Sequence, residues 1–120
     1  MKQSSMKMFV NPPCLYLYRE PVDFRKAVEG LALIVEQDME LSPFEESIFI
    51  FCNKGRDKIK ALYWDKTGFC LWYKRLEKQR FKWPLNYPKT QMLLTSQQWE
   101  SLLAGFPLIG HQTLDFATLS

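Results

Sequence analysis

The chain has 120 residues and a net charge of +3, and 47% of its residues are hydrophobic, so it is long and apolar enough for one domain with one core. Its apolar runs reach only five residues, as in Leu31–Val35, which argues against a membrane-spanning helix and against a signal peptide. Three widely spaced cysteines and one histidine include no CxxC pair, so we expect reduced thiols, no zinc site and a cytoplasmic protein.

The first half of the chain predicts a short strand followed by an amphipathic helix. Residues 15–18, LYLY, follow a Pro-Pro break and are typical of a strand. Apolar residues then recur at spacings of three and four, which predicts one helix over residues 23–38. Its apolar stripe consists of Phe24, Ala27, Val28, Leu31, Ile34 and Val35. Asp23 is placed to accept a hydrogen bond from the first turn of this helix.

From Ile48 the hydrophobic pattern becomes that of strands. IFIFC predicts a buried strand, KIKALYW a second and FCLWYKRL a third, separated by the loop NKGRD and the turn DKTG. A tight turn at DKTG would place Trp64 opposite Phe69 and Lys58 opposite Arg75. The three strands would then form an antiparallel meander whose cations collect at the end away from the turn.

The remaining residues predict a last short strand and a second helix. MLLT is the strand, and TSQQWESLLAG is the helix, capped by Thr95 or Ser96 and stopped by Gly105. We therefore expect a single-domain α+β fold with an antiparallel β-meander of four to five strands. The long helix would lie on its face, and the shorter helix, Ser96–Ala104, at its edge. The domain would span residues 1–120, with 1–12 and 106–120 as less ordered tails.

The charge is concentrated in the middle of the chain. Residues 53–89 hold eleven Lys and Arg against three Asp and Glu, a net charge of +8, whereas the segments before and after them are acidic. A block of this kind is typical of a protein that binds phosphates, as in nucleic acid. Cationic strand edges that keep a sheet soluble would give the same pattern.

Aromatic rings alternate with cations in this block, as in proteins that bind single strands. Core packing explains Trp64 and Trp72 as well, because their hairpin neighbours are apolar. From Lys74 to Trp83 cations dominate, so we expect this half to lie at the surface. The candidate nucleic-acid-binding residues are Lys58, Lys60, Lys74, Arg75, Lys78, Arg80, Lys82, Tyr73 and Trp83. The cations would otherwise form a solvated face.

Signs of catalysis are weak. Asp57, Asp65 and Glu77 could in principle converge on a metal ion, but aspartates are ordinary in turns and Glu77 lies in a charge run. His111 has only Asp115 as a nearby acidic partner, and no glycine-rich phosphate loop or nucleophile elbow is present. We expect no enzymatic activity, no catalytic residue, no metal and no cofactor.

Two long segments are distinctive: PVDFRKAVEGLALIV and SPFEESIFIFCNKGRDKIKALYWDKTGFCLWYKRLEKQRFKWP. They closely resemble the small accessory protein of the insertion sequence sixty-six (IS-66) family, the TnpB-type product of the second reading frame. The resemblance covers about residues 8–105. Phe24 stands where methionine is usual, and Gln79 where a glycine commonly precedes RFKWP. The resemblance implies a bacterial mobile element and a separate DDE-type transposase that cuts and joins DNA.

We therefore expect a non-enzymatic accessory protein for transposition that binds the element's DNA with weak selectivity. The basic hairpin and its C-terminal extension would contact phosphates, with Tyr73 and Trp83 stacking or wedging. The alternative is a protein-interaction module that docks on the transposase without DNA contact, with exposed aromatics such as Trp83 and Phe106 as anchors. No membrane and no small-molecule substrate is expected.

Overall fold

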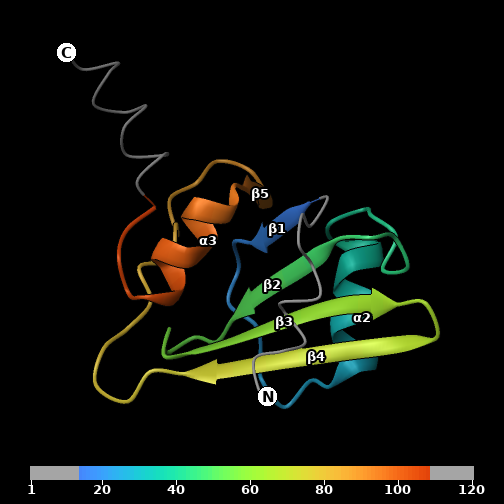
Figure 1. Cartoon of the computed structure of the whole chain (residues 1–120), viewed down its shortest axis with the longest axis horizontal. Coiled ribbons are helices and arrows are strands. Elements are labelled where there is room, and N and C mark those ends of the chain that lie inside the picture. The colour runs from blue at the N-terminus through green and yellow to red at the C-terminus, as the bar shows by residue number, and fades with distance from the viewer. Residues whose placement is uncertain (1–13, 109–120) are drawn as a thin grey trace.

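The structure is a computed structural model that describes residues 14–108. In chain order its elements are β1 (Leu15–Tyr18), α2 (Val28–Gln37), β2 (Ile48–Cys52), β3 (Lys58–Asp65), β4 (Gly68–Arg75), β5 (Gln91–Leu94) and α3 (Ser96–Leu103) (Figure 1). Of the tails expected over 1–12 and 106–120, only residues 106–108 fall within the described range. Within residues 14–108, no helix has the length and apolar character needed to cross a membrane.

The five strands form one sheet in the order β4-β3-β2-β1-β5. β2, β3 and β4 make the predicted antiparallel meander. The register of the hairpin is also as predicted, with Trp64 opposite Phe69 and Lys58 opposite Arg75, because a two-residue turn leaves only one way to align the strands. The predicted α+β fold with four to five strands and two helices is confirmed, and the sheet has five strands.

The prediction that all the strands run antiparallel is wrong for β1. This strand pairs in parallel with β2, with Leu15 opposite Ile48, and antiparallel with β5, with Leu15 opposite Leu94. The cause is the long connection that contains α2. It carries the chain back across the sheet, so that β2 starts at the same end as β1, and only such a crossover can join parallel neighbours.

The first helix also starts later than predicted, at Val28 rather than after Asp23. Asp23 closes a turn instead. Its Oδ1 accepts a hydrogen bond of 2.9 Å from the backbone N–H of Arg25, whose guanidinium pairs with the same carboxylate. Aspartate readily bonds the backbone two residues on, so it stabilises this turn rather than a helix start. The residue at the N-cap is Ala27, which offers no side-chain cap.

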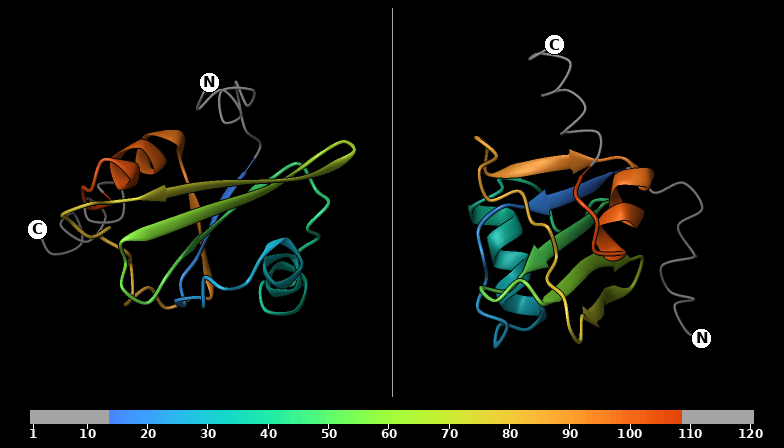
Figure 2. Two further views of the ribbon diagram at one scale, coloured as in Figure 1. Left: turned by 90° about the horizontal axis from the view of Figure 1, so that it is seen from below. Right: turned by 90° about the vertical axis from the view of Figure 1, so that its left-hand side faces the viewer.

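The two helices cover opposite faces of the sheet, which we call the α2 face and the α3 face (Figure 2, left view). α2 buries Leu31 and Val35 in an apolar cluster with residues of β2 and β3. α3 buries Trp99 and Leu102 in a second cluster on the other side. It follows the edge strand β5 but packs on the α3 face rather than at the edge of the sheet, where it was predicted, because Trp99 and Leu102 are buried against the sheet. All five residues of β2 are buried because both of its faces are covered.

Candidate nucleic-acid interface

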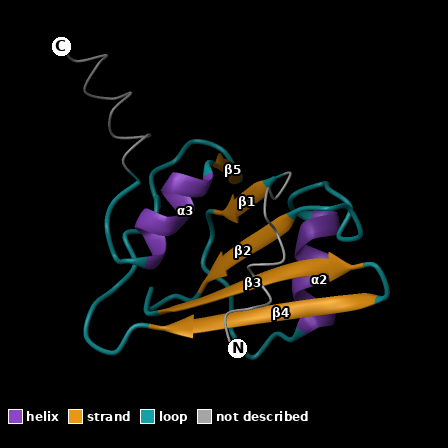
Figure 3. Ribbon diagram, in the orientation of Figure 1, coloured by secondary structure: helices purple, strands orange, loops and turns teal. Residues whose placement is uncertain are grey.

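The hairpin of β3 and β4 divides the predicted binding residues between the two faces of the sheet. Four of them alternate onto the α2 face: Lys58, Lys60, Tyr73 and Arg75. Lys74 lies on the α3 face. Three more of the predicted residues are exposed cations on the extension after β4, residues 76–90: Lys78, Arg80 and Lys82. Figure 3 shows the hairpin turn projecting at one end of the molecule, while the β2–β3 loop and the extension lie at the other.

Lys74 makes a contact within the protein. Its Nζ donates a hydrogen bond of 3.0 Å to the carbonyl oxygen of Leu103, the last residue of α3. A cation is favourable there, because the carbonyl groups at the end of a helix carry partial negative charge. Lys74 thus ties β4 to α3.

Lys60 holds the loop before α2. Its Nζ donates hydrogen bonds of 3.0 Å to the carbonyl oxygens of Phe24 and Lys26 and lies 4.8 Å from the centre of the Phe24 ring. Partial burial lowers the pKa of the Lys60 ammonium from its ordinary value. An ammonium has three N–H donors, so the two carbonyl bonds leave one for a ligand.

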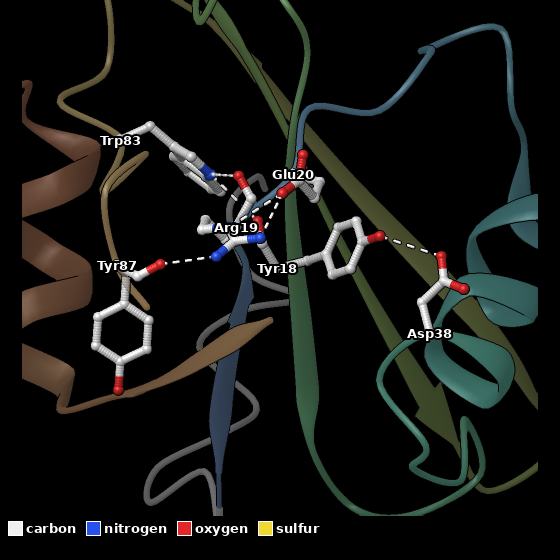
Figure 4. Close-up of polar contacts among 6 residues, drawn as sticks. All are labelled: Tyr18, Arg19, Glu20, Asp38, Trp83 and Tyr87. Atoms are coloured by element: carbon white, nitrogen blue, oxygen red, sulfur yellow. Dashed lines mark hydrogen bonds and ion pairs between the residues drawn. The ribbon is translucent and has the colours of Figure 1, made fainter. Parts of the chain in front are cut away.

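Trp83 is buried, so its predicted place at the surface is wrong. Its side chain is 7% exposed, and its Nε1 donates to the carbonyl oxygens of Tyr18 and Arg19, both at 3.1 Å (Figure 4). Arg19 in turn donates from its guanidinium to the carbonyl oxygen of Tyr87 at 2.8 Å. The cause is alternation along the extension, where Phe81 and Trp83 point inward and the cation between them points outward. Buried in this way, Trp83 cannot stack on a base or anchor a partner.

A groove of about 740 Å³ opens beside Tyr73; we call it the Tyr73 groove. Its walls come from the loop before α2, the β2–β3 loop and the two hairpin strands. The cations that line it are Arg25, Lys54, Lys58 and Lys60, and the rings are Phe24 and Tyr73. One lining carboxylate, Asp23, is paired with Arg25, and this pairing lowers the pKa of Asp23 to about 2. The Tyr73 side chain is 50% exposed, so the groove offers a ring face as well as positive charge.

A second groove, of about 420 Å³, opens beside the extension; we call it the Arg80 groove. Its cations are Arg56, Arg80 and Lys82, and none of the described residues that line it is acidic. Its two rings, Phe81 and Trp83, are only 1% and 7% exposed. This groove therefore offers positive charge with little aromatic surface.

The β2–β3 loop, residues 53–57, separates the two grooves and is firmly held. Lys54 lines the Tyr73 groove, and Arg56, two residues later, lines the Arg80 groove. The Asn53 side chain accepts hydrogen bonds from the backbone N–H groups of Asp57 and Lys58 and donates one to the Asp57 carboxylate, which lowers the pKa of Asp57. The extension adds a bond of 2.7 Å from the backbone N–H of Phe81 to the carbonyl oxygen of Arg56. The β2–β3 loop thus contributes cations to both grooves.

Sequence reasoning did not single out three of the lining cations: Arg25, Lys54 and Arg56. The signal for two of them was the loop NKGRD, whose cations flank a glycine between two strands. Arg25 gave no signal, because only the folded chain brings it to the hairpin. Three predicted cations lie outside the grooves: Lys74, Lys78, and Arg75, which pairs with Glu77 at 3.1 Å.

The three carboxylates considered for a metal site do not converge. Asp57 precedes β3 and Asp65 ends it, a separation of roughly 26 Å at the usual rise of a strand. Over residues 14–108 no group of three or more Cys, His, Asp and Glu side chains is placed to hold a metal ion. His111 and Asp115 lie outside the described residues.

Comparison with known proteins gives a family. The family model described as IS66 Orf2 like protein matches residues 14–113. The chain belongs to the IS66 Orf2-like family. The predicted resemblance to these insertion-sequence accessory proteins is confirmed, and the matched residues include both grooves.

This IS66 Orf2-like chain is also similar to two curated proteins of Sinorhizobium fredii (strain NBRC 101917 / NGR234). It is 37% identical to uncharacterized protein y4jC over 65 residues, which cover 54% of this chain and 56% of that protein. It is 36% identical to uncharacterized protein y4hO over 62 residues, which cover 52% and 54%. The chain thus spans about half the length of the curated relatives it matches. No solved structure matches it.

Proposed function

We propose that this IS66 Orf2-like protein is a non-enzymatic accessory factor that binds the DNA of its insertion sequence during transposition. The observation that carries the proposal is the pair of cation-lined grooves on either side of the β2–β3 loop. Four cations and one already paired carboxylate line the first, and three cations line the second. Concave surfaces of one sign attract polyanions strongly, and DNA carries its charge on regularly spaced phosphates.

The predicted residues have different roles in this proposal. Lys58, Arg80 and Lys82 contact phosphates from the grooves, together with Arg25, Lys54 and Arg56. Arg75 and Lys78 add charge outside the grooves. Lys74 braces the fold, whereas Lys60 both holds the loop before α2 and keeps one N–H for a phosphate in the Tyr73 groove. Phosphate contacts carry no sequence information, so the protein alone has weak selectivity for the element's ends.

Binding to DNA in a salt series tests the proposal. We expect similar affinities for duplexes from the element's ends and for unrelated duplexes, measured by fluorescence anisotropy with the purified protein. If six phosphate contacts form, the logarithm of the association constant falls with the logarithm of salt concentration at a slope of roughly −5. An affinity that does not change with salt, or an absence of binding at low salt, would overturn the proposal.

A matched pair of double variants separates the grooves from general charge. Arg80→Gln with Lys82→Gln removes two cations from the Arg80 groove. Lys66→Gln with Lys89→Gln removes two exposed cations that line neither groove. We expect the first pair to weaken DNA binding and to make the salt slope shallower by the amount that corresponds to about two phosphate contacts. The second pair should have a much smaller effect on both quantities. If both double variants weakened DNA binding equally, the groove cations would contribute no more to binding than other exposed cations do.

Docking on the transposase is a second candidate, favoured by one observation. Phe106 follows α3 and is 59% exposed, and large exposed rings are frequent anchors at interfaces. Co-purification with the transposase after nuclease treatment separates the two functions. Retention of the complex supports docking, and its loss supports a link through DNA.

A further inference from the structure

The two cationic grooves differ in what else they offer to a ligand. In the Arg80 groove both rings are buried. In the Tyr73 groove half of the Tyr73 side chain is exposed beside the cations. A ligand there can meet an aromatic face and a positive charge together.

The strands hold the ring and the cations in a fixed arrangement. Tyr73 of β4 lies directly opposite Lys60 of β3, and opposed residues on one face have their Cβ atoms about 4.5–5.5 Å apart. Lys58 lies two residues before Lys60 and therefore on the same face. The Lys60 ammonium is held over the Phe24 ring by two carbonyl groups. The ring and the charged groups thus need little rearrangement to receive a ligand.

An unpaired nucleotide matches this arrangement. Its base has an aromatic face that can stack on a tyrosine, and its phosphate suits the lysines. A base inside a duplex must first leave its stack, which costs a few kcal/mol. The groove volume of about 740 Å³ lies within the usual range of ligand sites, about 300–1,000 Å³. Beyond the β2–β3 loop, the Arg80 groove offers further cations to the adjacent phosphates.

We propose that the Tyr73 groove binds an unpaired nucleotide of single-stranded DNA, with its base stacked on Tyr73 and its phosphate on Lys58 and Lys60. The protein accordingly prefers a single strand to a duplex. This inference rests on the proposed function, because it assumes that DNA occupies the cationic grooves.

The test compares three labelled probes by fluorescence anisotropy: an oligothymidylate, a strand of equal length made of abasic sites, and a duplex. The abasic strand keeps the phosphates and removes the bases. We expect the wild type to bind the oligothymidylate between about 5-fold and about 150-fold more tightly than the abasic strand, the range for one stacked base. It should also bind the oligothymidylate more tightly than the duplex.

Variants at Tyr73 then identify the ring. Tyr73→Ala should remove the preference for the oligothymidylate and leave the affinities for the abasic strand and the duplex unchanged, whereas Tyr73→Phe should keep the preference. Tyr73→Leu retains apolar bulk on β4 and replaces the alanine variant if thermal unfolding shows that variant to be unstable. The matched control is Phe44→Ala, which removes a ring that is 56% exposed and packs against Trp64 near the hairpin turn.

The outcomes separate this inference from the proposed function. Salt-dependent binding with equal affinity for the oligothymidylate and the abasic strand overturns only the inference. So does a Tyr73→Ala variant that weakens binding to all three probes alike, or a Phe44→Ala variant that matches it. No binding to any probe at low salt overturns the proposed function itself.

Discussion

At the scale of single residues, the indole of Trp83 joins parts of the chain that lie 65 residues apart. Its N–H is shared between two consecutive carbonyl groups at the end of β1, and its ring belongs to the apolar cluster on the α3 face. Buried carbonyl groups that lose their donor retain the cost of desolvation. The side chain therefore supports the fold through both packing and hydrogen bonding.

Trp83→Phe should lower the free energy of unfolding by about 1–3 kcal/mol, because a smaller aromatic ring remains and the N–H donor is lost. Trp83→Ala should lower it by about 3–5 kcal/mol, because a cavity is added. Urea titration followed by circular dichroism measures both. The phenylalanine variant should bind DNA as the wild type does under conditions where it is folded. Full stability with weakened DNA binding would instead place the indole in contact with DNA.

Tyr18 makes stability depend on alkaline pH. Burial, and next the hydrogen bond of 3.1 Å that its hydroxyl donates to Asp38, raise its pKa to about 12 (Figure 4). The unfolded state loses the same proton near pH 10. The stabilisation that the protonated Tyr18 hydroxyl gives to the folded state is therefore fully present below pH 10 and is lost as pH rises from 10 to about 12.

Tyr18→Phe should cost about 0.5–1.5 kcal/mol at neutral pH, because the hydrogen bond is removed. The difference in urea midpoint between wild type and variant should shrink as pH rises above 10. A difference that stays constant between pH 8 and pH 11 would show that Tyr18 ionises equally easily in both states. Asp38→Asn offers a second comparison, since it keeps an acceptor for the hydroxyl.

At the scale of elements, the lysines on the two faces of the β3–β4 hairpin have different roles. Lys74 ends at the last carbonyl of α3, whereas Lys58 and Lys60 line the Tyr73 groove. Alternation along a strand separates these roles within a few residues. The net charge of the segment is therefore a poor measure of how many cations are available to DNA.

Lys74→Met tests this division. We expect it to lower the free energy of unfolding by about 0.3–1 kcal/mol, the usual value of a cation at a helix C-terminus. DNA affinity at a given salt concentration should change little. Arg80→Met is the matched control and should do the reverse, because Arg80 is exposed and lines a groove. A Lys74 variant that loses DNA affinity without losing stability would show that Lys74 contacts DNA rather than bracing α3.

Local signals account for most of what the sequence predicted correctly. Strand alternation and a two-residue turn determine the hairpin register, and Thr95 with Gln98 forms a capping box at α3. The predicted direction of β1 relative to β2 was wrong, because this direction depends on the path of the connection that contains α2. Exposed cations of the site were predicted from composition, but Trp83 was misplaced because the carbonyl groups that bind it belong to a distant strand.

At the scale of the whole molecule, the sheet separates two apolar clusters, one under each helix. β2 contributes to both, with Phe49 and Phe51 on the α2 face and Ile48 and Ile50 on the α3 face. Neither helix can leave without exposing one side of this central strand. The described part of the chain should therefore unfold as one unit.

Truncations in the two clusters should act on a single transition. Leu31→Ala on the α2 face and Leu102→Ala on the α3 face each remove a side chain that is 0% exposed, and each should cost about 2–5 kcal/mol. Tryptophan fluorescence and far-ultraviolet circular dichroism should report the same urea midpoint in both variants. Different midpoints for the two signals, with the fluorescence transition of Leu102→Ala at a lower urea concentration than its circular dichroism transition, would show that the two layers unfold independently.

The pairing of β1 with β5 has a consequence for synthesis on the ribosome. β1 is among the first described residues to emerge, yet its partner on one side, residues 91–94, follows more than seventy residues later. Until then the outer edge of β1 offers unpaired N–H and carbonyl groups to any other chain, and such edges promote aggregation. Translation that stops within the extension yields a meander with this edge open. A messenger truncated before the codon of Gln91 should therefore give an insoluble product, although four of the five strands are complete.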